Sequence, residues 1–213
     1  MTPAFSICVY CGSRPGNEPG FAGLARAVGD WIGRHGGQLV YGGGNNGLMG
    51  VVADATLAAG GRVVGIIPKA LMDKEIGHKG LTELRVVGSM HERKAMMADL
   101  AESFIAMPGG FGTFDEFFEI LTWAQLGMHR KPCAVLNTAH YFDPLIALFD
   151  QAVNEGFVRD SALLVFLVIS DEEDNYANPP EPQGGSTPET ATFIKDEEAR
   201  WREVIRSANV ILE

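Results

Sequence analysis

The stretch SFIAMPGGFGTFDEFFEILTWAQL, residues 103–126, places a short apolar run, a glycine-rich turn and an amphipathic segment one after another. The apolar run Ser103–Met107 predicts a buried strand. Apolar side chains then recur at helical spacing over Thr113–Leu126, which predicts a helix. A strand, a tight turn and a helix in this order form the repeating unit of parallel α/β proteins.

The same unit recurs along most of the chain. Apolar runs predict further strands at Phe5–Tyr10, Gln38–Tyr41, Arg62–Ile67, Leu84–Val87, Pro132–Leu136 and Leu163–Ile169. Helical patterns separate them at Phe21–Ile32, Leu48–Ala59, Met90–Glu102 and Phe142–Asn154. The alternation predicts an α/β fold, a doubly wound parallel sheet with helices on both faces. Ligands of such sheets bind beyond the carboxyl ends of the strands.

A second glycine cluster, GGGNNGLMG at residues 42–50, follows the predicted strand Gln38–Tyr41. Backbone N–H groups at such a turn can bind a phosphate. The cluster is not a Walker A motif, and the acidic residue of a dinucleotide site is missing after the next strand. A tight turn that allows close helix–strand packing remains the alternative. Since both clusters follow strands, they are expected to line one crevice.

The turn PGGFGTFDE, residues 108–116, directs the N–H groups of a helix start toward an anion. Thr113 can add a hydroxyl to that site, and Glu116 lies one turn into the helix. Two interpretations of Glu116 stay open. It lies beside a bound phosphoribosyl group, or Thr113-x-x-Glu116 is a capping box that needs no substrate.

Two cations, Arg93 and Lys94, stand in the motif MHERK at the start of another predicted helix. They either offset the charge of a phosphate or lie on a solvated helix face. Cys8-x-x-Cys11 has the spacing of a redox pair or of half a zinc site. The five histidines are scattered and supply no second half, so we predict no metal site.

The composition is that of a globular protein, with 46% hydrophobic and 21% charged residues. The formal net charge of −10 argues against nucleic-acid binding, which needs a basic surface. No apolar run reaches the roughly 18 residues of a membrane span, and the first residues lack a signal-peptide pattern. We therefore expect no membrane partner. Three cysteines fit a reducing compartment, which predicts a cytoplasmic location.

The last part of the chain has a different character. Residues 171–192 hold four prolines and six acidic residues, which predicts a mobile loop. Residues 194–213 then show an amphipathic helical pattern. The predicted organisation is one domain over 1–170, a mobile acidic loop over 171–193, and a terminal helix over 194–213 that packs on the same domain or on a partner.

MHERK followed by PGGFGTFDE, with GGGNNGLMG upstream and TWAQLG at 122–127 downstream, strongly resembles the LOG (Lonely Guy) family. Members of that family are cytokinin riboside 5′-monophosphate phosphoribohydrolases and have often been labelled lysine decarboxylases. CVYCGSRPG at residues 8–16 is similar to the opening strand and turn of the family. The resemblance extends over about residues 5–158.

The resemblance implies a Rossmann-like fold, a homodimer, and neither a metal nor another cofactor. It implies hydrolysis of the N-glycosidic bond of a nucleoside 5′-monophosphate to the free base and ribose 5-phosphate. The catalytic arginine and glutamate of the family correspond to Arg93 and Glu116. Expected substrate-binding residues are Ser13, Gly43, Gly44, Gly47, Glu75, Lys94, Gly109, Gly110, Phe111, Gly112, Thr113 and Thr122.

Two alternatives to a cytokinin nucleotide hydrolase remain. LOG-like proteins that cleave plain AMP share the same motifs, so a general purine 5′-nucleotide nucleosidase is one of them. A nucleotide- or molybdenum-cofactor-binding protein without hydrolase activity is the other. The helix over 113–126 also carries Phe114, Phe117, Phe118 and Trp123, more large apolar groups than one helix face buries against a sheet. We therefore expect some of them to contact a partner subunit.

Overall fold

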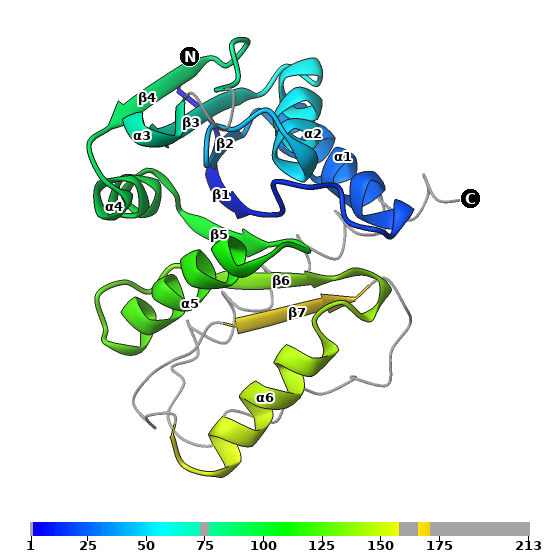
Figure 1. The fold of residues 1–213 in the computed structure, drawn as a ribbon, viewed down its shortest axis with the longest axis vertical. Coiled ribbons are helices and arrows are strands. Elements are labelled where there is room, and N and C mark those ends of the chain that lie inside the picture. The colour runs from blue at the N-terminus through cyan, green and yellow to red at the C-terminus, as the bar shows by residue number, and fades with distance from the viewer. Residues whose placement is uncertain (1, 73–76, 158–165, 171–213) are drawn as a thin grey trace.

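A computed structural model describes residues 2–72, 77–157 and 166–170 (Figure 1). The strands are β1 Ser6–Tyr10, β2 Gln38–Tyr41, β3 Arg62–Pro68, β4 Glu83–Val87, β5 Ser103–Ala106, β6 Cys133–Asn137 and β7 Phe166–Ser170. The helices are α1 Pro19–Arg34, α2 Gly47–Ala58, α3 Lys69–Met72, α4 Met90–Leu100, α5 Phe111–Gln125 and α6 Asp143–Asn154, with a 3₁₀ turn, η1, at Thr138–His140.

The seven strands form one sheet in the order β4-β3-β2-β1-β5-β6-β7, and every neighbouring pair is parallel. The chain first builds outward from β1 to β4 and then crosses back to place β5 on the other side of β1. This is the predicted doubly wound, Rossmann-like α/β fold. The order reverses between β1 and β5, which is the switch point where such sheets bind ligands.

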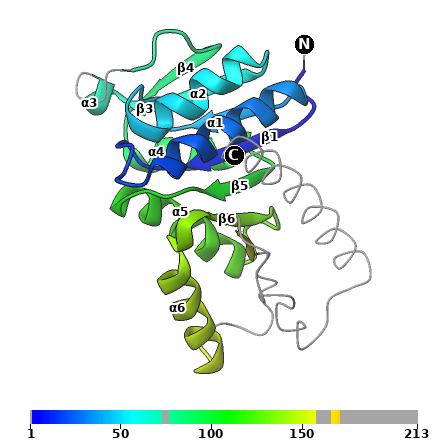
Figure 2. The same ribbon diagram turned by 90° about the vertical axis from the view of Figure 1, so that its right-hand side faces the viewer.

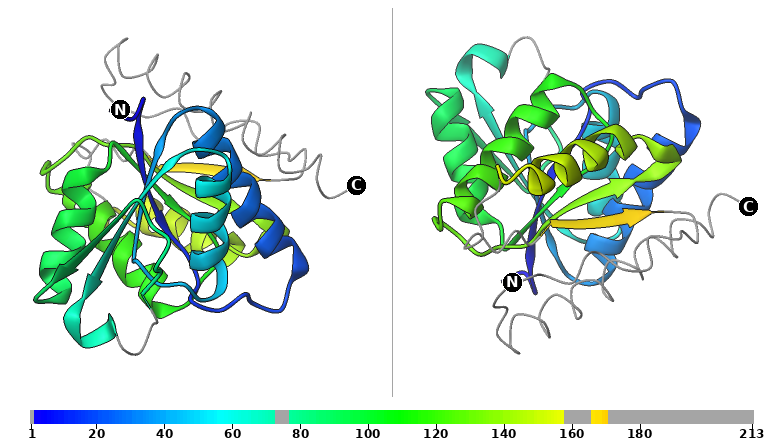
Figure 3. Two further views of the ribbon diagram at one scale, coloured as in Figure 1. Left: turned by 90° about the horizontal axis from the view of Figure 1, so that it is seen from above. Right: turned by 90° about the horizontal axis from the view of Figure 1, so that it is seen from below.

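Helices cover both faces of the sheet, as the view in Figure 3 shows. Side chains of α1 and α2 pack with Ile7 and Val9 on one face, and side chains of α4, α5 and α6 pack with Cys8 and Tyr10 on the other. The alternation along β1 follows from the two-residue period of a strand. Helix α6 lies at the end of the molecule remote from β4 (Figure 1 and Figure 2).

The two cysteines of the Cys-x-x-Cys motif contribute to different core clusters, so their side chains lie on opposite faces of the sheet. Both are free and buried, and burial raises the pKa of each thiol above its usual value. The redox-pair interpretation of Cys8 and Cys11 is therefore not supported by the structure. Within the described residues no group of three or more histidine, cysteine or acidic side chains could hold a metal ion.

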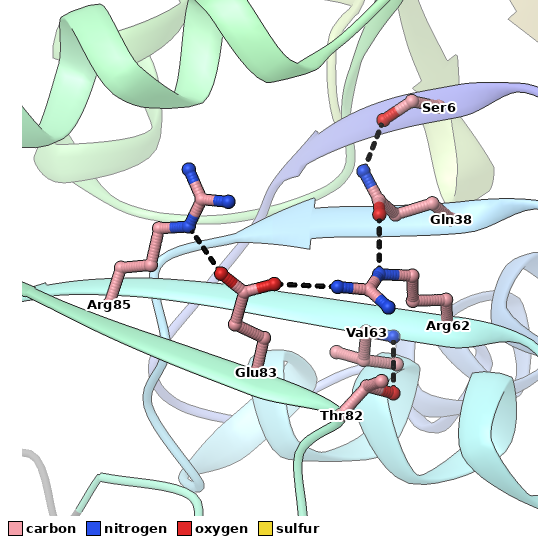
Figure 4. A network of polar contacts seen from close by, with 7 residues as sticks. All are labelled: Ser6, Gln38, Arg62, Val63, Thr82, Glu83 and Arg85. Atoms are coloured by element: carbon pink, nitrogen blue, oxygen red, sulfur yellow. Dashed lines mark hydrogen bonds and ion pairs between the residues drawn. The ribbon is translucent and has the colours of Figure 1, made fainter. Parts of the chain in front are cut away.

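A chain of polar contacts joins the amino ends of the first four strands (Figure 4). Gln38 Nε2 donates to Ser6 Oγ at 3.0 Å, and Arg62 Nε donates to Gln38 Oε1 at 2.9 Å. The Glu83 carboxylate then accepts hydrogen bonds from Arg62 at 2.6 Å and from Arg85 at 2.7 Å. These contacts hold the amino ends of the strands together. The glycine-rich turns lie at the opposite, carboxyl edge of the sheet.

Most predicted elements are confirmed to within one or two residues. One start was wrong in a way that matters, because the helix predicted from Thr113 begins at Phe111, with Gly110 as its N-cap. The proposed loop over 171–193, the terminal helix over 194–213 and the expected substrate contact Glu75 lie outside the described residues. None of the helices in the described ranges is long and apolar enough to cross a membrane.

Candidate active site

Three loops meet at the carboxyl edge of the sheet, beside the switch point. Gly12, two residues after the end of β1, donates its N–H to the carbonyl of Pro108 at 3.0 Å. The Gly12 carbonyl accepts the N–H of Leu48, at the start of α2, at 3.0 Å. The turn after β1 is thus held between the turn before α5 and the first residues of α2. The predicted single crevice for both glycine clusters is built around this junction.

A cavity of about 210 Å³ opens at the junction. The loop after β1 contributes Ser13 and Arg14, and the turn before α5 contributes Gly109 and Gly110. Tyr141, from the segment between β6 and α6, completes this side of the wall. This lining includes a serine, an arginine and two glycines, residue types whose hydroxyl, guanidinium and backbone N–H groups can bind phosphate.

The N-terminus of α5 is open beside this cavity. Gly110 caps the helix without a side-chain hydrogen bond, and a Cβ placed on Gly110 or Gly112 would meet nothing within 4 Å in the described part of the chain. The first N–H groups of α5 are therefore accessible. Together with the positive end of the helix dipole they form a site for an anion.

Gly109 allows a close approach beneath this turn. A Cβ on Gly109 would lie 2.1 Å from Thr113 Oγ1 and 2.9 Å from the Gly12 nitrogen, so no larger residue fits. Thr113 itself is buried in the first turn of α5. Because Thr113 lies inside the helix and not before it, the interpretation of Thr113-x-x-Glu116 as a capping box is wrong.

Glu116 instead forms an ion pair with Arg93. Arg93 Nη2 lies 3.3 Å from Glu116 Oε1, and the two side chains are only 7% and 11% exposed. The guanidinium packs against the end of β2, where a Cβ on Gly42 would lie 2.1 Å from Nη2. Arg93 Nε has no hydrogen-bond partner among the described residues. A solvated helix face is therefore the wrong interpretation of Arg93, whose Nε is buried and unsatisfied within the described ranges.

Lys94, the neighbour of Arg93, links α4 to α5. Its ammonium lies 2.7 Å from Glu119 Oε2 and 3.0 Å from Asp115 Oδ2. Desolvation opposes the charged form, but the hydrogen bonds to both carboxylates raise the pKa of Lys94 above its usual value. Lys94, which was expected to contact the nucleotide, thus pairs with two acidic side chains of α5, and these ion pairs connect α4 to α5.

The glycines after β2 are covered by the segment that follows Glu75. His78 donates its backbone N–H to the carbonyl of Gly43 at 3.0 Å, and Gly44 pairs with Gly77 in an antiparallel bridge. At Gly47, which adopts a φ of +59°, a Cβ would lie 2.4 Å from backbone atoms of the loop after β1. In the structure Gly43, Gly44 and Gly47 thus pack closely against neighbouring backbone, as the tight-turn alternative to a phosphate site predicts.

Two other expected contacts, Phe111 and Thr122, are not among the residues that line the cavity. The Phe111 ring is 93% exposed at the start of α5. Thr122 lies about 16 Å further along the helix, given a rise of 1.5 Å per residue, and its hydroxyl donates to the Phe118 carbonyl. The structure therefore places Ser13, Gly109 and Gly110 around one cavity and pairs Arg93 with Glu116 one turn into α5, and it does not bring Thr122 to them.

The chain matches the model of a family described as "possible lysine decarboxylase" over residues 49–178. It is 47% identical over 169 residues to the cytokinin riboside 5′-monophosphate phosphoribohydrolase of Rhodococcoides fascians, with 79% of this chain and 85% of that protein aligned. The chain belongs to the LOG family. An Arabidopsis thaliana LOG protein with the same enzyme name is 47% identical over 156 residues, which cover 73% of this chain and 72% of that protein.

Solved structures share the fold of this LOG-family chain at lower identity. The molybdenum cofactor carrier protein of Chlamydomonas reinhardtii is 21% identical, with a TM-score of 0.57 over 79% of this chain and 89% of that chain. The molybdenum cofactor binding protein of Rippkaea orientalis is 18% identical, with a TM-score of 0.57 over 93% and 98% of the two chains. At these identities the likeness establishes the common fold alone.

Proposed function

We propose that this LOG-family chain hydrolyses the N-glycosidic bond of cytokinin riboside 5′-monophosphates to the free base and ribose 5-phosphate. The buried ion pair between Arg93 and Glu116, next to an open helix N-terminus, is the observation that carries the proposal. The names of relatives 47% identical to the chain support the same reaction. No metal or other cofactor takes part in the proposed reaction.

The 5′-phosphate binds at the start of α5 and in the adjoining cavity. The N–H groups of Gly110 to Thr113 and the hydroxyl of Ser13 are the expected donors, and Arg14 adds a cation that sequence reasoning missed. Holding the phosphate here fixes the ribose relative to Glu116, one helical turn away. Such fixation lowers the barrier because the translational and rotational entropy of the ribose is lost on binding, before the chemical step begins.

Cleavage breaks the bond between ribose C1′ and the base nitrogen, and the bonding electron pair leaves with the base. Positive charge then develops on the ribose, and the Glu116 carboxylate stabilises it. Water adds to C1′ while Glu116 accepts its proton, which passes on to the departing base. Arg93 holds the carboxylate in place through the ion pair.

We further propose that the protein is a homodimer in the cytoplasm. Phe118, Leu126 and Met128 leave large apolar side chains exposed on and just after α5, and burying them against a second copy would remove this surface from water. Phe117, one of the four groups of which some were expected to contact a partner, is buried in the core of its own chain. All three cysteines are free, as in proteins of a reducing compartment.

The substrate proposal is tested by incubating the purified protein with isopentenyladenosine 5′-monophosphate, AMP and GMP and quantifying the released base by chromatography. The expected result is the fastest release from the isopentenyladenosine nucleotide. Equal rates with AMP would make the protein a general purine nucleotide nucleosidase. Absence of release from all three would contradict the hydrolase and favour a binding protein.

A further inference from the structure

The segment between β6 and α6 brings a tyrosine to the glycine turn of the candidate active site. The Tyr141 hydroxyl donates a hydrogen bond to the carbonyl of Gly109, which is 32 residues away in sequence. The tyrosine ring contacts three other aromatic rings at centroid distances of 5.0–6.5 Å, those of Phe21, Phe114 and Phe142. The hydroxyl is therefore presented to Gly109 from a rigid aromatic cluster.

The backbone that carries Tyr141 adopts an unusual conformation. Ala139 and His140 have φ values of 51° and 57°, two successive non-glycine residues in the left-handed region. Such residues cost on the order of 1 kcal/mol each and persist where surrounding contacts impose them. Here the Asn137 side chain accepts the N–H of Phe142 and donates to Asp143, each at 2.7 Å. The turn is thus stabilised in the form that directs Tyr141 toward the cavity.

The hydrogen bond to Gly109 has a consequence for its neighbour Gly110. The Gly109 carbonyl and the Gly110 N–H belong to one planar trans peptide, so they point in opposite directions. A partner that fixes the carbonyl also fixes the direction of the N–H. A Cβ on Gly110 would meet nothing within 4 Å among the described residues, so side-chain packing at that position does not set the plane. The Tyr141 hydroxyl supplies that constraint.

We propose that Tyr141 is a positioning residue for the phosphate of the substrate. Its hydroxyl orients the Gly109–Gly110 peptide so that the Gly110 N–H faces the anion at the start of α5, and its ring walls the same cavity. The inference rests on the proposed function for the identity of the nucleotide. Because Tyr141 acts through a phosphate-binding amide and not at C1′, its loss affects phosphate binding and leaves the bond-breaking step nearly unchanged.

The test compares Tyr141→Phe with the wild type, since phenylalanine keeps the ring contacts and removes only the hydroxyl. We expect KM for isopentenyladenosine 5′-monophosphate to rise about three- to tenfold, the range for losing one hydrogen bond, with kcat changed less than about twofold. Inhibition by inorganic phosphate should weaken by a similar factor. Inhibition by the unphosphorylated riboside should not change.

Tyr41→Phe is the matched control, because the Tyr41 hydroxyl is buried without a hydrogen-bond partner among the described residues. Equal KM values for Tyr141→Phe and wild type would overturn the inference, as would an equal loss for phosphate and for the riboside, which would mark a merely structural role. A wild-type protein that hydrolyses none of the nucleotides would refute the proposed function alone. Calorimetric titration of both proteins with inorganic phosphate would then decide the role of Tyr141, and a wild type that binds no phosphate would overturn it.

Discussion

Gly42 gives a way to displace the proposed catalytic arginine without changing it. The residue directly follows β2 and lies against the guanidinium, and the Cβ of an alanine would lie 2.1 Å from Arg93 Nη2 and 3.2 Å from Cζ. Non-bonded heavy atoms need about 3.5 Å, so the guanidinium has to move by more than about 1 Å. The moving group is the end of a long side chain, and the fold can therefore accept the change.

The expected cost falls on catalysis more than on stability. A shift of this size breaks the 3.3 Å contact between Arg93 and Glu116. Misplacing a catalytic group by about 1 Å lowers the rate by roughly 10²-fold, and we expect Gly42→Ala to lose kcat/KM by about that factor. The free energy of unfolding should fall by about 1 kcal/mol, which is about 2–4 °C in Tm for a chain of this size.

The assay is base release from isopentenyladenosine 5′-monophosphate, with Tm measured on the same samples. Gly20→Ala serves as the control, because a Cβ there would approach no atom closer than 3.7 Å. It should retain wild-type activity. A folded Gly42→Ala protein with wild-type kcat/KM would refute the reasoning, since the position of Arg93 would then be irrelevant to the reaction.

Three further outcomes are expected. Ala139→Gly should raise the free energy of unfolding by about 0.5–1 kcal/mol, because glycine adopts the φ of 51° without strain; a lower Tm in calorimetry would contradict this. Hydrogen bonding from Arg85 lowers the pKa of Glu83 below its usual 4.5, so its stabilising contribution is present above that pH and is lost as the pH falls through the native value. The stability difference between wild type and Glu83→Gln in urea titrations should therefore shrink from pH 6 to pH 3, and a constant difference would exclude the contact as its source. Light scattering at micromolar concentration should give twice the chain mass, and a monomer mass would contradict the homodimer.

The fold could be predicted from local patterns because each strand is a short apolar run that ends at a glycine, a proline or a polar turn. The order of the strands could not, since it depends on pairings between distant segments such as Ile7 with Ser103. Those pairings place the turns after β1 and β5 side by side. The shared crevice could be predicted because ligands of parallel sheets bind beyond the carboxyl ends of the strands. The residues that line it could be identified only from the structure.

The capping box shows how one pattern fits two positions. Ser89-x-x-Glu92 has the same spacing as Thr113-x-x-Glu116, and it is the one that caps a helix: Ser89 Oγ accepts the N–H of Glu92 at 3.1 Å, and the Glu92 carboxylate accepts the N–H of Gly88 at 2.7 Å. The glycine-rich turn lets α5 begin earlier than its apolar pattern indicates. Glu116 therefore lies beyond the position that a capping box requires, and its side chain forms an ion pair with Arg93.

The burial of Arg93 and the contact of Tyr141 with Gly109 could not be predicted from the sequence. An adjacent arginine and lysine at a helix start are ordinary on a solvated face, and Arg93 is buried against Gly42, which lies just after β2 in a distant part of the sequence. The contact of Tyr141 crosses between two turns and has no motif, and alanine and histidine carry no signal for a left-handed backbone. The catalytic role expected for Arg93 follows from the resemblance to the LOG family.

The central claim is that the Arg93–Glu116 pair cleaves the glycosidic bond, and the turnover of Glu116→Gln tests it most directly. Glutamine keeps the size of the side chain but can neither take up the proton nor balance the developing positive charge. We predict that kcat falls by roughly 10²-fold or more at a temperature well below the melting transition, while Asp115→Asn, one residue away, changes it less than about threefold. A folded Glu116→Gln protein that releases base at the wild-type rate would contradict the claim and leave the ion pair a structural contact.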